Sequence, residues 1–191
     1  MSDTWIDDAE RLSLQFFREV RESFAFLKSA YKYYGPASEK IEGPTDYRDT
    51  TAIAAYTHYR MRVKVGWYIS SGNAYVRFET PQIRNGLPTA QEVEARRAAY
   101  PYFMDLYGLA RLLGKAEDPD FLLGDVWNHY ESKSRKRREL LENDLRGVLD
   151  GLARATERYA SHVLAGDSSQ FAAVYAYQDT HKDDYIRGRK K

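Results

Sequence analysis

The sequence predicts an α+β fold, in which an antiparallel sheet of three to four strands packs against a long N-terminal helix and C-terminal helices. Apolar residues recur every three or four positions near both ends of the chain, which is the period of a helix. Between residues 50 and 80 the period changes to two, as in strands with one buried face. A chain of 191 residues is also long enough to bury a core without disulfides or metal ions.

The first predicted element is a helix from residue 6 to residue 34. Its apolar side chains follow a helical spacing at Phe16, Val20, Phe24, Leu27 and Tyr31. Gly35 and Pro36 are a typical stop, because glycine accepts a left-handed cap and proline cannot continue the hydrogen-bond ladder. Residues 36–49 contain two prolines and one glycine, which predicts a loop.

The predicted sheet spans residues 50–80 and includes a hairpin. An earlier strand is expected in "TTAIAAYT". In the hairpin, alternation directs one set of side chains into the core, chiefly Val63, Val65, Trp67, Val76 and Phe78. The opposite set faces outward: Arg62, Lys64, Tyr68, Tyr75 and Arg77. A turn at residues 70–73 would pair Trp67 with Val76 and Val65 with Phe78 inside, and Tyr68 with Tyr75 and Lys64 with Glu79 outside.

Helices are predicted over residues 90–165. Thr89 and Glu92 form a capping box, and the helix that follows is kinked at Pro101 and resumes through residues 102–114. A final long helix runs from about residue 127 to 165. Its expected buried stripe is Leu141, Leu145, Val148, Leu149, Leu152, Thr156, Tyr159, Ala160, Val163 and Leu164. Gly147 and Gly151 in this helix indicate a bend or a close approach of another segment.

These elements are expected to form a single domain over residues 1–171. Residues 172–191 are predicted to be a mobile tail with little to bury. The chain has no cysteine, which excludes thiol catalysis, disulfides and cysteine-ligated zinc. It has neither a secretory signal nor an apolar run that could span a membrane, so we expect a cytoplasmic protein without membrane partners.

The charge is almost balanced overall but locally basic around the hairpin. The 29 basic and 28 acidic residues give a net charge of +1, so no global field attracts nucleic acid or membrane. Residues 51–100 hold seven bases and three acids, a local charge of +4.

The segment "SGNAYVRF" (residues 71–78) is close to the central-strand signature of the RNA recognition motif. It matches at Gly72, Ala74, Tyr75, Val76 and Phe78. It departs at Ser71, where the motif has a basic residue, and at Asn73, where it has an aromatic one. The motif also needs a helix before the preceding strand, and here that region reads as strand. The segment is therefore interpreted as an ordinary hairpin.

The outward set of Arg62, Lys64, Tyr68, Tyr75 and Arg77 is the candidate partner-binding surface. Tyrosine and arginine dominate binding hot spots, because they combine a large contact area with directional donors. Such a surface could bind an acidic protein, or it could stack and neutralise single-stranded nucleic acid. The competing interpretation is that a helix covers this face and leaves its charges at the rim.

The remaining motifs have simpler interpretations. The basic run "SRKRRE" (residues 134–139) reads as a salt-bridged helix face, and the acids between residues 117 and 125 read as loop charge. The four histidines have no metal-ligand spacing at His58, His129, His162 and His181. No catalytic motif is present, so no enzyme activity, cofactor or metal is expected; an enzyme site assembled only by the fold, with His58 or His129 beside an acid, stays open.

The order of elements, ending in "YASHVLAGDSSQF" (residues 159–171), resembles a loose group of small bacterial α+β proteins. Some members of this group are encoded beside toxins as candidate immunity proteins. The resemblance fixes no active site, and the charged segment from about residue 115 to 140 departs from it. It implies a non-enzymatic protein-binding module, such as an immunity-type inhibitor of a bacterial toxin. The alternative is a nucleic-acid-binding protein that uses the same hairpin face, with the basic run 135–138 as a further contact.

Overall fold

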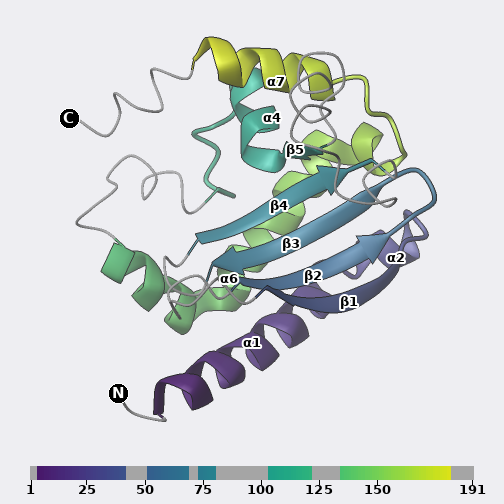
Figure 1. Ribbon diagram of the computed structural model, residues 1–191. Helices are drawn as coiled ribbons and strands as arrows, with labels where there is room; N and C mark the ends of the chain where they lie inside the picture. Colours follow the sequence, from purple (N-terminus) through teal and green to yellow (C-terminus); the bar gives the residue numbers. More distant parts are fainter. Residues whose placement is uncertain (1–3, 42–50, 69–72, 81–102, 122–133, 182–191) are drawn as a thin grey trace, which may run out of the picture.

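The computed structural model confirms an α+β fold in which the sheet is antiparallel throughout. It describes the chain except for residues 1–3, 42–50, 69–72, 81–102, 122–133 and 182–191 (Figure 1). The described elements are α1 (Thr4–Ser23), α2 (Phe26–Ser29), β1 (Tyr34–Ile41), β2 (Thr51–Thr57), β3 (Arg62–Tyr68), β4 (Asn73–Glu79), β5 (Phe103–Asp105), α4 (Leu106–Leu112), α6 (Ser134–Leu164) and α7 (Phe171–Thr180). Within the described residues the sheet has five strands in the order β1-β2-β3-β4-β5, which is one strand more than the largest number predicted.

One face of the sheet packs against helices (Figure 1). α1 contacts β2, α6 contacts β4, and the two helices contact each other. α4 and α7 contact each other and β5 at one end of the sheet. The hairpin side chains predicted to face the core are all buried, namely Val63, Val65, Trp67, Val76 and Phe78. The predicted helix contributions Leu27, Leu149 and Leu152 are buried as well, and Tyr31 packs against the same cluster.

The N-terminal helix is shorter than predicted. α1 ends at Ser23, and the chain bends before the four-residue α2. Lys32 then adopts a left-handed φ of 60°, and the Tyr33 N–H donates to the Leu27 carbonyl at 2.9 Å. The predicted end at residue 34 is wrong because the apolar spacing continues across the bend and does not reveal it.

The predicted loop over residues 36–49 begins instead as the edge strand β1. The register of β1 with β2 is irregular around Gly35 and Pro36, and proline is tolerated in an edge strand because it need not donate to a neighbour. Gly35 has a φ of +116°, and a Cβ there would lie 2.7 Å from the Ala55 carbonyl oxygen, so this position requires glycine. Residues 42–50 of the predicted loop lie outside the described residues.

The register of β3 with β4 differs by two residues from the predicted one. The core pairs are Val63 with Phe78, Val65 with Val76, and Trp67 with Ala74. The strands are joined through residues 69–72 rather than 70–73, since Tyr68 pairs with Asn73. Because side chains alternate with a period of two, this shift leaves each one on its predicted face. The outer pairs expected to lie directly opposite, Tyr68 with Tyr75 and Lys64 with Glu79, become diagonal neighbours.

The helix predicted over residues 102–114 starts later than expected. Its first residues form β5, a short strand beside β4. The helix α4 then begins at Leu106, because the Asp105 carboxylate caps it by accepting a hydrogen bond from the Gly108 N–H at 2.5 Å. The predicted capping box at Thr89 and the kink at Pro101 lie outside the described residues.

The long C-terminal helix is confirmed as α6, and its stripe from Leu145 onward is buried or packed on the core. The helix is kinked at Asp144, whose φ of −140° and ψ of 44° are not helical. The Asp144 carboxylate accepts a hydrogen bond from the Gly147 N–H at 3.1 Å, so it caps the second half of the helix. At Gly151 a Cβ would lie 2.6 Å from the Asp120 carbonyl oxygen. The bend and the close approach therefore both occur.

The predicted tail over residues 172–191 is wrong in its first part. Gly166, with a φ of +97°, ends α6 as expected, and the chain then forms α7. Phe171 and Val174 of this helix are buried in the main core. Residues 182–191 lie outside the described part of the chain.

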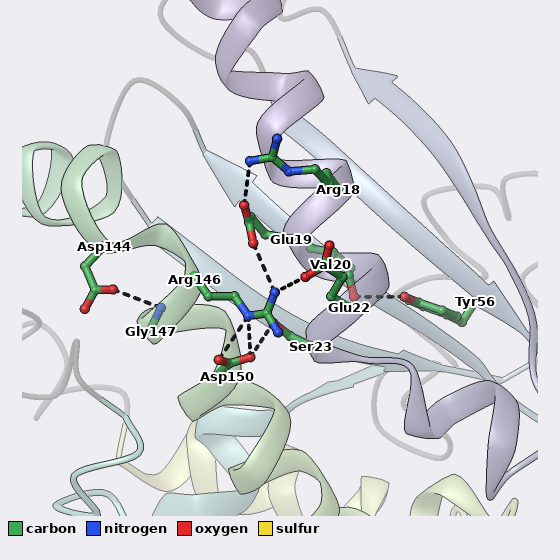
Figure 2. Close-up of polar contacts among 10 residues, drawn as sticks. All are labelled: Arg18, Glu19, Val20, Glu22, Ser23, Tyr56, Asp144, Arg146, Gly147 and Asp150. Carbon is green, nitrogen blue, oxygen red and sulfur yellow. Dashed lines mark hydrogen bonds and ion pairs between the residues drawn. The ribbon is translucent and has the colours of Figure 1, made fainter.

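Arg146 joins α6 to α1 through a set of ion pairs (Figure 2). Its guanidinium bonds to Glu19 at 3.2 Å, to Glu22, and within its own helix to Asp150 at 3.0 Å. Ser23 also donates to the Asp150 carboxylate at 2.6 Å. Hydrogen bonds from Arg18 and Arg146 lower the pKa of the Glu19 carboxyl. These contacts hold the two helices in register over the sheet.

A buried hydrogen bond joins the sheet to α1. The hydroxyl of Tyr56, a fully buried residue of β2, donates to the Val20 carbonyl at 3.2 Å (Figure 2). Burial raises the pKa of this phenol.

We expect Tyr56→Phe to lower the free energy of unfolding by about 1 kcal/mol, because it removes one buried hydrogen bond while keeping the ring. Urea unfolding followed by circular dichroism measures this change. Tyr34→Phe is the matched control, since the Tyr34 side chain is 78% exposed. Equal stability of the Tyr56 variant and the wild type would contradict the proposed contribution of this bond.

Candidate binding surface on the outer face of the sheet

The five residues predicted to bind a partner lie together on the face of the sheet opposite α1 and α6. We call this surface the outer face; it comprises Arg62, Lys64, Tyr68, Tyr75, Arg77, Glu79 and Phe103. Tyr68 is 37% exposed, whereas Tyr75 and Arg77 are half-buried. The side chains of Arg62 and Lys64 retain 26% and 16% exposure. The outer face is therefore a partly open surface whose side chains pack on one another.

Two tyrosines form the first part of this surface. The rings of Tyr68 and Tyr75 lie 5.1 Å apart between centroids. The ring of Tyr75 covers Gly66, the residue directly across the strand pair, and a Cβ at Gly66 would lie only 2.2 Å from that ring. Glycine at this position thus creates the space in which Tyr75 lies flat on the sheet. Burial in this position, with a smaller effect of Tyr68, raises the pKa of Tyr75 to about 12.

Arg77 lies between two aromatic rings. Its guanidinium carbon is 5.3 Å from the centroid of Tyr75 and 4.8 Å from that of Phe103. Cations at such distances are attracted by the negative faces of aromatic rings. Phe103 is 51% exposed, so the sandwich ends in an accessible apolar side chain. Tyr68, Tyr75, Arg77 and Phe103 form a continuous row of planar groups across three strands, with contacts from one to the next.

Glu79 is the buried carboxylate of this surface, with 5% of the residue exposed. Its Oε2 lies 3.2 Å from the Lys64 ammonium and 4.0 Å from the Arg62 guanidinium. A buried carboxylate is tolerated when cations compensate it. The ion pairs therefore fix one side of the outer face, while the aromatic row forms the other.

Sequence reasoning missed Phe103 and the role of Gly66. Phe103 is part of a three-residue strand, which is too short for an alternating pattern to be recognised. Gly66 interrupts the alternation of β3, and only the ring of Tyr75 above it explains why a glycine is there. An isolated glycine inside a strand pattern, which signals a close approach, was the available indication.

The acids of the loop after α4 were predicted to be solvated charge, but two of them form ion pairs with α6. Asp118 accepts hydrogen bonds from Arg158 at 2.8 Å and from the Tyr159 hydroxyl, and Asp120 accepts one from Arg154 at 2.7 Å. The bond from Tyr159 and the other donors lower the pKa of Asp118. These contacts attach the loop to α6, which is a structural role.

The histidines fall in different surroundings. The His58 ring lies tilted against Tyr59 after β2, with ring centroids 4.2 Å apart, and His181 stacks on Tyr177 at 4.1 Å. His162 lies in the last turn of α6. His129 and the side chains of the basic run 134–139 lie outside the described part. Within the described ranges, no group of three or more histidine, cysteine, aspartate or glutamate side chains could hold a metal ion.

Comparison of the chain with family models, curated proteins and solved structures finds no match. No helix within the described residues combines the length and apolar character needed to cross a membrane.

The burial of Tyr75 predicts that its phenol loses its proton at a higher pH than an exposed tyrosine does. We expect its pKa to be about 12, and expect Gly66→Ala to bring it back toward the ordinary value of 10.0 by pushing the ring off the sheet. Since the unfolded chain releases this proton first, its contribution to stability is lost as the pH rises from about 10 to about 12. NMR of ¹³Cζ-labelled tyrosine follows the titration, and Tyr75→Phe identifies the signal. Titration near pH 10 in the wild type would refute the packed arrangement.

Proposed function

We propose that this chain is a non-enzymatic protein-binding module whose partner docks on the outer face of the sheet. The observation that supports this most is the row of Tyr68, Tyr75, Arg77 and Phe103, which combines two accessible aromatic side chains with a stacked arginine. Tyrosine and arginine are the residue types that most often dominate binding energy at protein interfaces. Because the row is held by packing within the sheet, little side-chain entropy is lost when a partner binds.

Within this class we favour an immunity-type inhibitor of a bacterial toxin, acting in the cytoplasm. The support is the order of elements described above together with the α+β architecture. Such an inhibitor needs no chemistry of its own, because it works by covering a surface of the toxin. A toxin-sized reading frame beside the gene would supply the partner, and rescue of growth on co-expression would measure inhibition.

The test of protein binding uses the two most exposed side chains of the row. We expect the double variant Tyr68→Ala/Phe103→Ala to lose a partner that the wild type retains in affinity purification from the native cells. Leu14→Ala is the matched control, because Leu14 is 66% exposed but lies on α1, in the helical layer on the other side of the sheet. Mass spectrometry identifies the retained proteins, and circular dichroism confirms that the variants fold.

The expected result is at least one protein held by the wild type and by the Leu14 variant but absent with the double variant. If the double variant retained every protein that the wild type retains, the outer face would not be the binding surface.

A second candidate function is binding of single-stranded nucleic acid by the same row. Arg77 lies between the rings of Tyr75 and Phe103, and Tyr68 contacts Tyr75, so the row provides a cation and planar faces. This combination binds bases and phosphates without sequence preference. Phe78, however, is fully buried in the core, so this aromatic position of the RNA-recognition-like segment does not reach a ligand.

Salt distinguishes the two functions. If nucleic acid is the ligand, affinity for a labelled oligothymidylate falls steeply as salt rises, with a slope set by the number of phosphates contacted. Fluorescence anisotropy from low to physiological salt measures this slope, with the Tyr68→Ala/Phe103→Ala variant as the control for the site. No binding at low salt would eliminate this candidate.

A further inference from the structure

Arg77 is held by aromatic rings but has no carboxylate partner among the described residues. The guanidinium contacts Tyr75 and Phe103, and no hydrogen bond or ion pair joins its N–H groups to another described residue. Charged donors that are partly removed from water without an acceptor are unfavourable in a folded protein. The position of Arg77 therefore needs an explanation beyond packing.

The charges across the hairpin explain why Arg77 has no carboxylate partner among the described residues. Lys64 lies directly opposite Arg77 in the β3–β4 pairing, and like charges in that position repel. The carboxylate next to both, Glu79, lies 3.2 Å from the Lys64 ammonium and within reach of Arg62. No ion pair joins Glu79 to Arg77 in this part of the structure, because Lys64 takes the carboxylate.

The carboxylate on the other side of Arg77 is also occupied. Asp105 is directly opposite Arg77 in the β4–β5 pairing. One of its oxygens accepts a hydrogen bond from the Gly108 N–H at 2.5 Å, and the other accepts one from the Gln178 side chain at 3.0 Å. Asp105 thus caps α4 and bonds to α7, and no ion pair joins it to Arg77 among the described residues.

We propose that Arg77 is the specificity residue of the outer face and binds a carboxylate side chain of the partner protein. This deepens the proposed protein-binding function and depends on it. Stacking between two rings fixes the plane of the guanidinium, and its two terminal nitrogens can then donate two parallel hydrogen bonds to a planar carboxylate, the bidentate geometry that arginine favours.

The surroundings of Arg77 define the rest of the partner segment. Phe103 and Tyr68 present accessible rings at the two ends of the row. The matching segment therefore carries aspartate or glutamate with apolar side chains on both sides. A phosphate would satisfy Arg77 electrostatically, but the exposed ring of Phe103 and the neutralisation of Lys64 by Glu79 favour a singly charged group beside apolar ones.

The test uses random twelve-residue peptides displayed on phage and selected on four immobilised proteins. These are the wild type, Arg77→Lys, the Tyr68→Ala/Phe103→Ala variant, and Arg60→Lys. The last is the matched control, because Arg60 also stacks on a tyrosine, with its guanidinium carbon 5.0 Å from the Tyr59 centroid, but lies in the turn between β2 and β3. Lysine keeps the charge and loses the planar bidentate contact.

We expect peptides selected by the wild type to share an aspartate or glutamate flanked by apolar residues. As synthetic peptides they should bind Arg77→Lys about thirtyfold more weakly and bind Arg60→Lys unchanged, since losing one charge-assisted hydrogen bond of the bidentate pair has an effect of about that size. Replacing the peptide's acid by its amide should cause a similar loss. This second measurement does not depend on how well the Arg77 variant folds.

Other outcomes identify which proposal fails. Selected peptides without an acid, or acidic peptides whose affinity survives both Arg77→Lys and the amide replacement, overturn the role of Arg77 while leaving protein binding intact. Peptides that bind the Tyr68→Ala/Phe103→Ala variant as well as the wild type count against the outer face itself. Competition by oligothymidylate at physiological salt, with no acidic peptide selected, assigns Arg77 to a phosphate and also overturns the proposal.

Discussion

The antiparallel pairing of β3 with β4 determines which side chains of this protein enter its core and which form its outer face. Trp67 and the valines of β3 project toward α1 and α6, so every second residue must project the other way. A charged residue placed on the core side would lose its hydration against fully buried aromatic and aliphatic groups. The burial of one face therefore fixes the chemistry of the other, and the arginines and tyrosines of the hairpin cannot rotate out of their positions.

The features predicted correctly from the sequence are those governed by local periodicity. The hairpin faces follow from alternation over seven-residue strands, and the buried stripe of α6 follows from helical spacing. Features that depend on distant partners were not predictable in this way. β1 contains Gly35 and Pro36 and becomes a strand only because β2 supplies hydrogen bonds along its edge. The register of the hairpin depends on the turn, and alternation alone does not distinguish registers that differ by two residues.

The candidate site was predictable as a set of residues but not as an arrangement. The alternation of side chains along the strand placed Arg77 and Tyr75 on one face of the sheet. It did not indicate that the guanidinium of Arg77 lies between two aromatic rings. That contact requires Phe103, which reaches the sheet through a strand of three residues. Glu79 pairs with Lys64, and Asp105 caps α4. These pairings exist only in the folded chain. They could not be derived from the local charge of +4 over residues 51–100.

The kink at Asp144 interrupts the hydrogen-bond ladder of α6. The part of the helix after the kink is capped by Asp144, which accepts the Gly147 N–H, and it is tied to α1 through Arg146 and to the core through its buried stripe. Fraying of a helix spreads from residue to residue along the hydrogen-bond ladder, and a capped break interrupts that spread. Unwinding that began at Ser134 would consequently stop at Asp144, and the layer that supports the sheet would stay intact while the first part of the helix exchanged its amide protons.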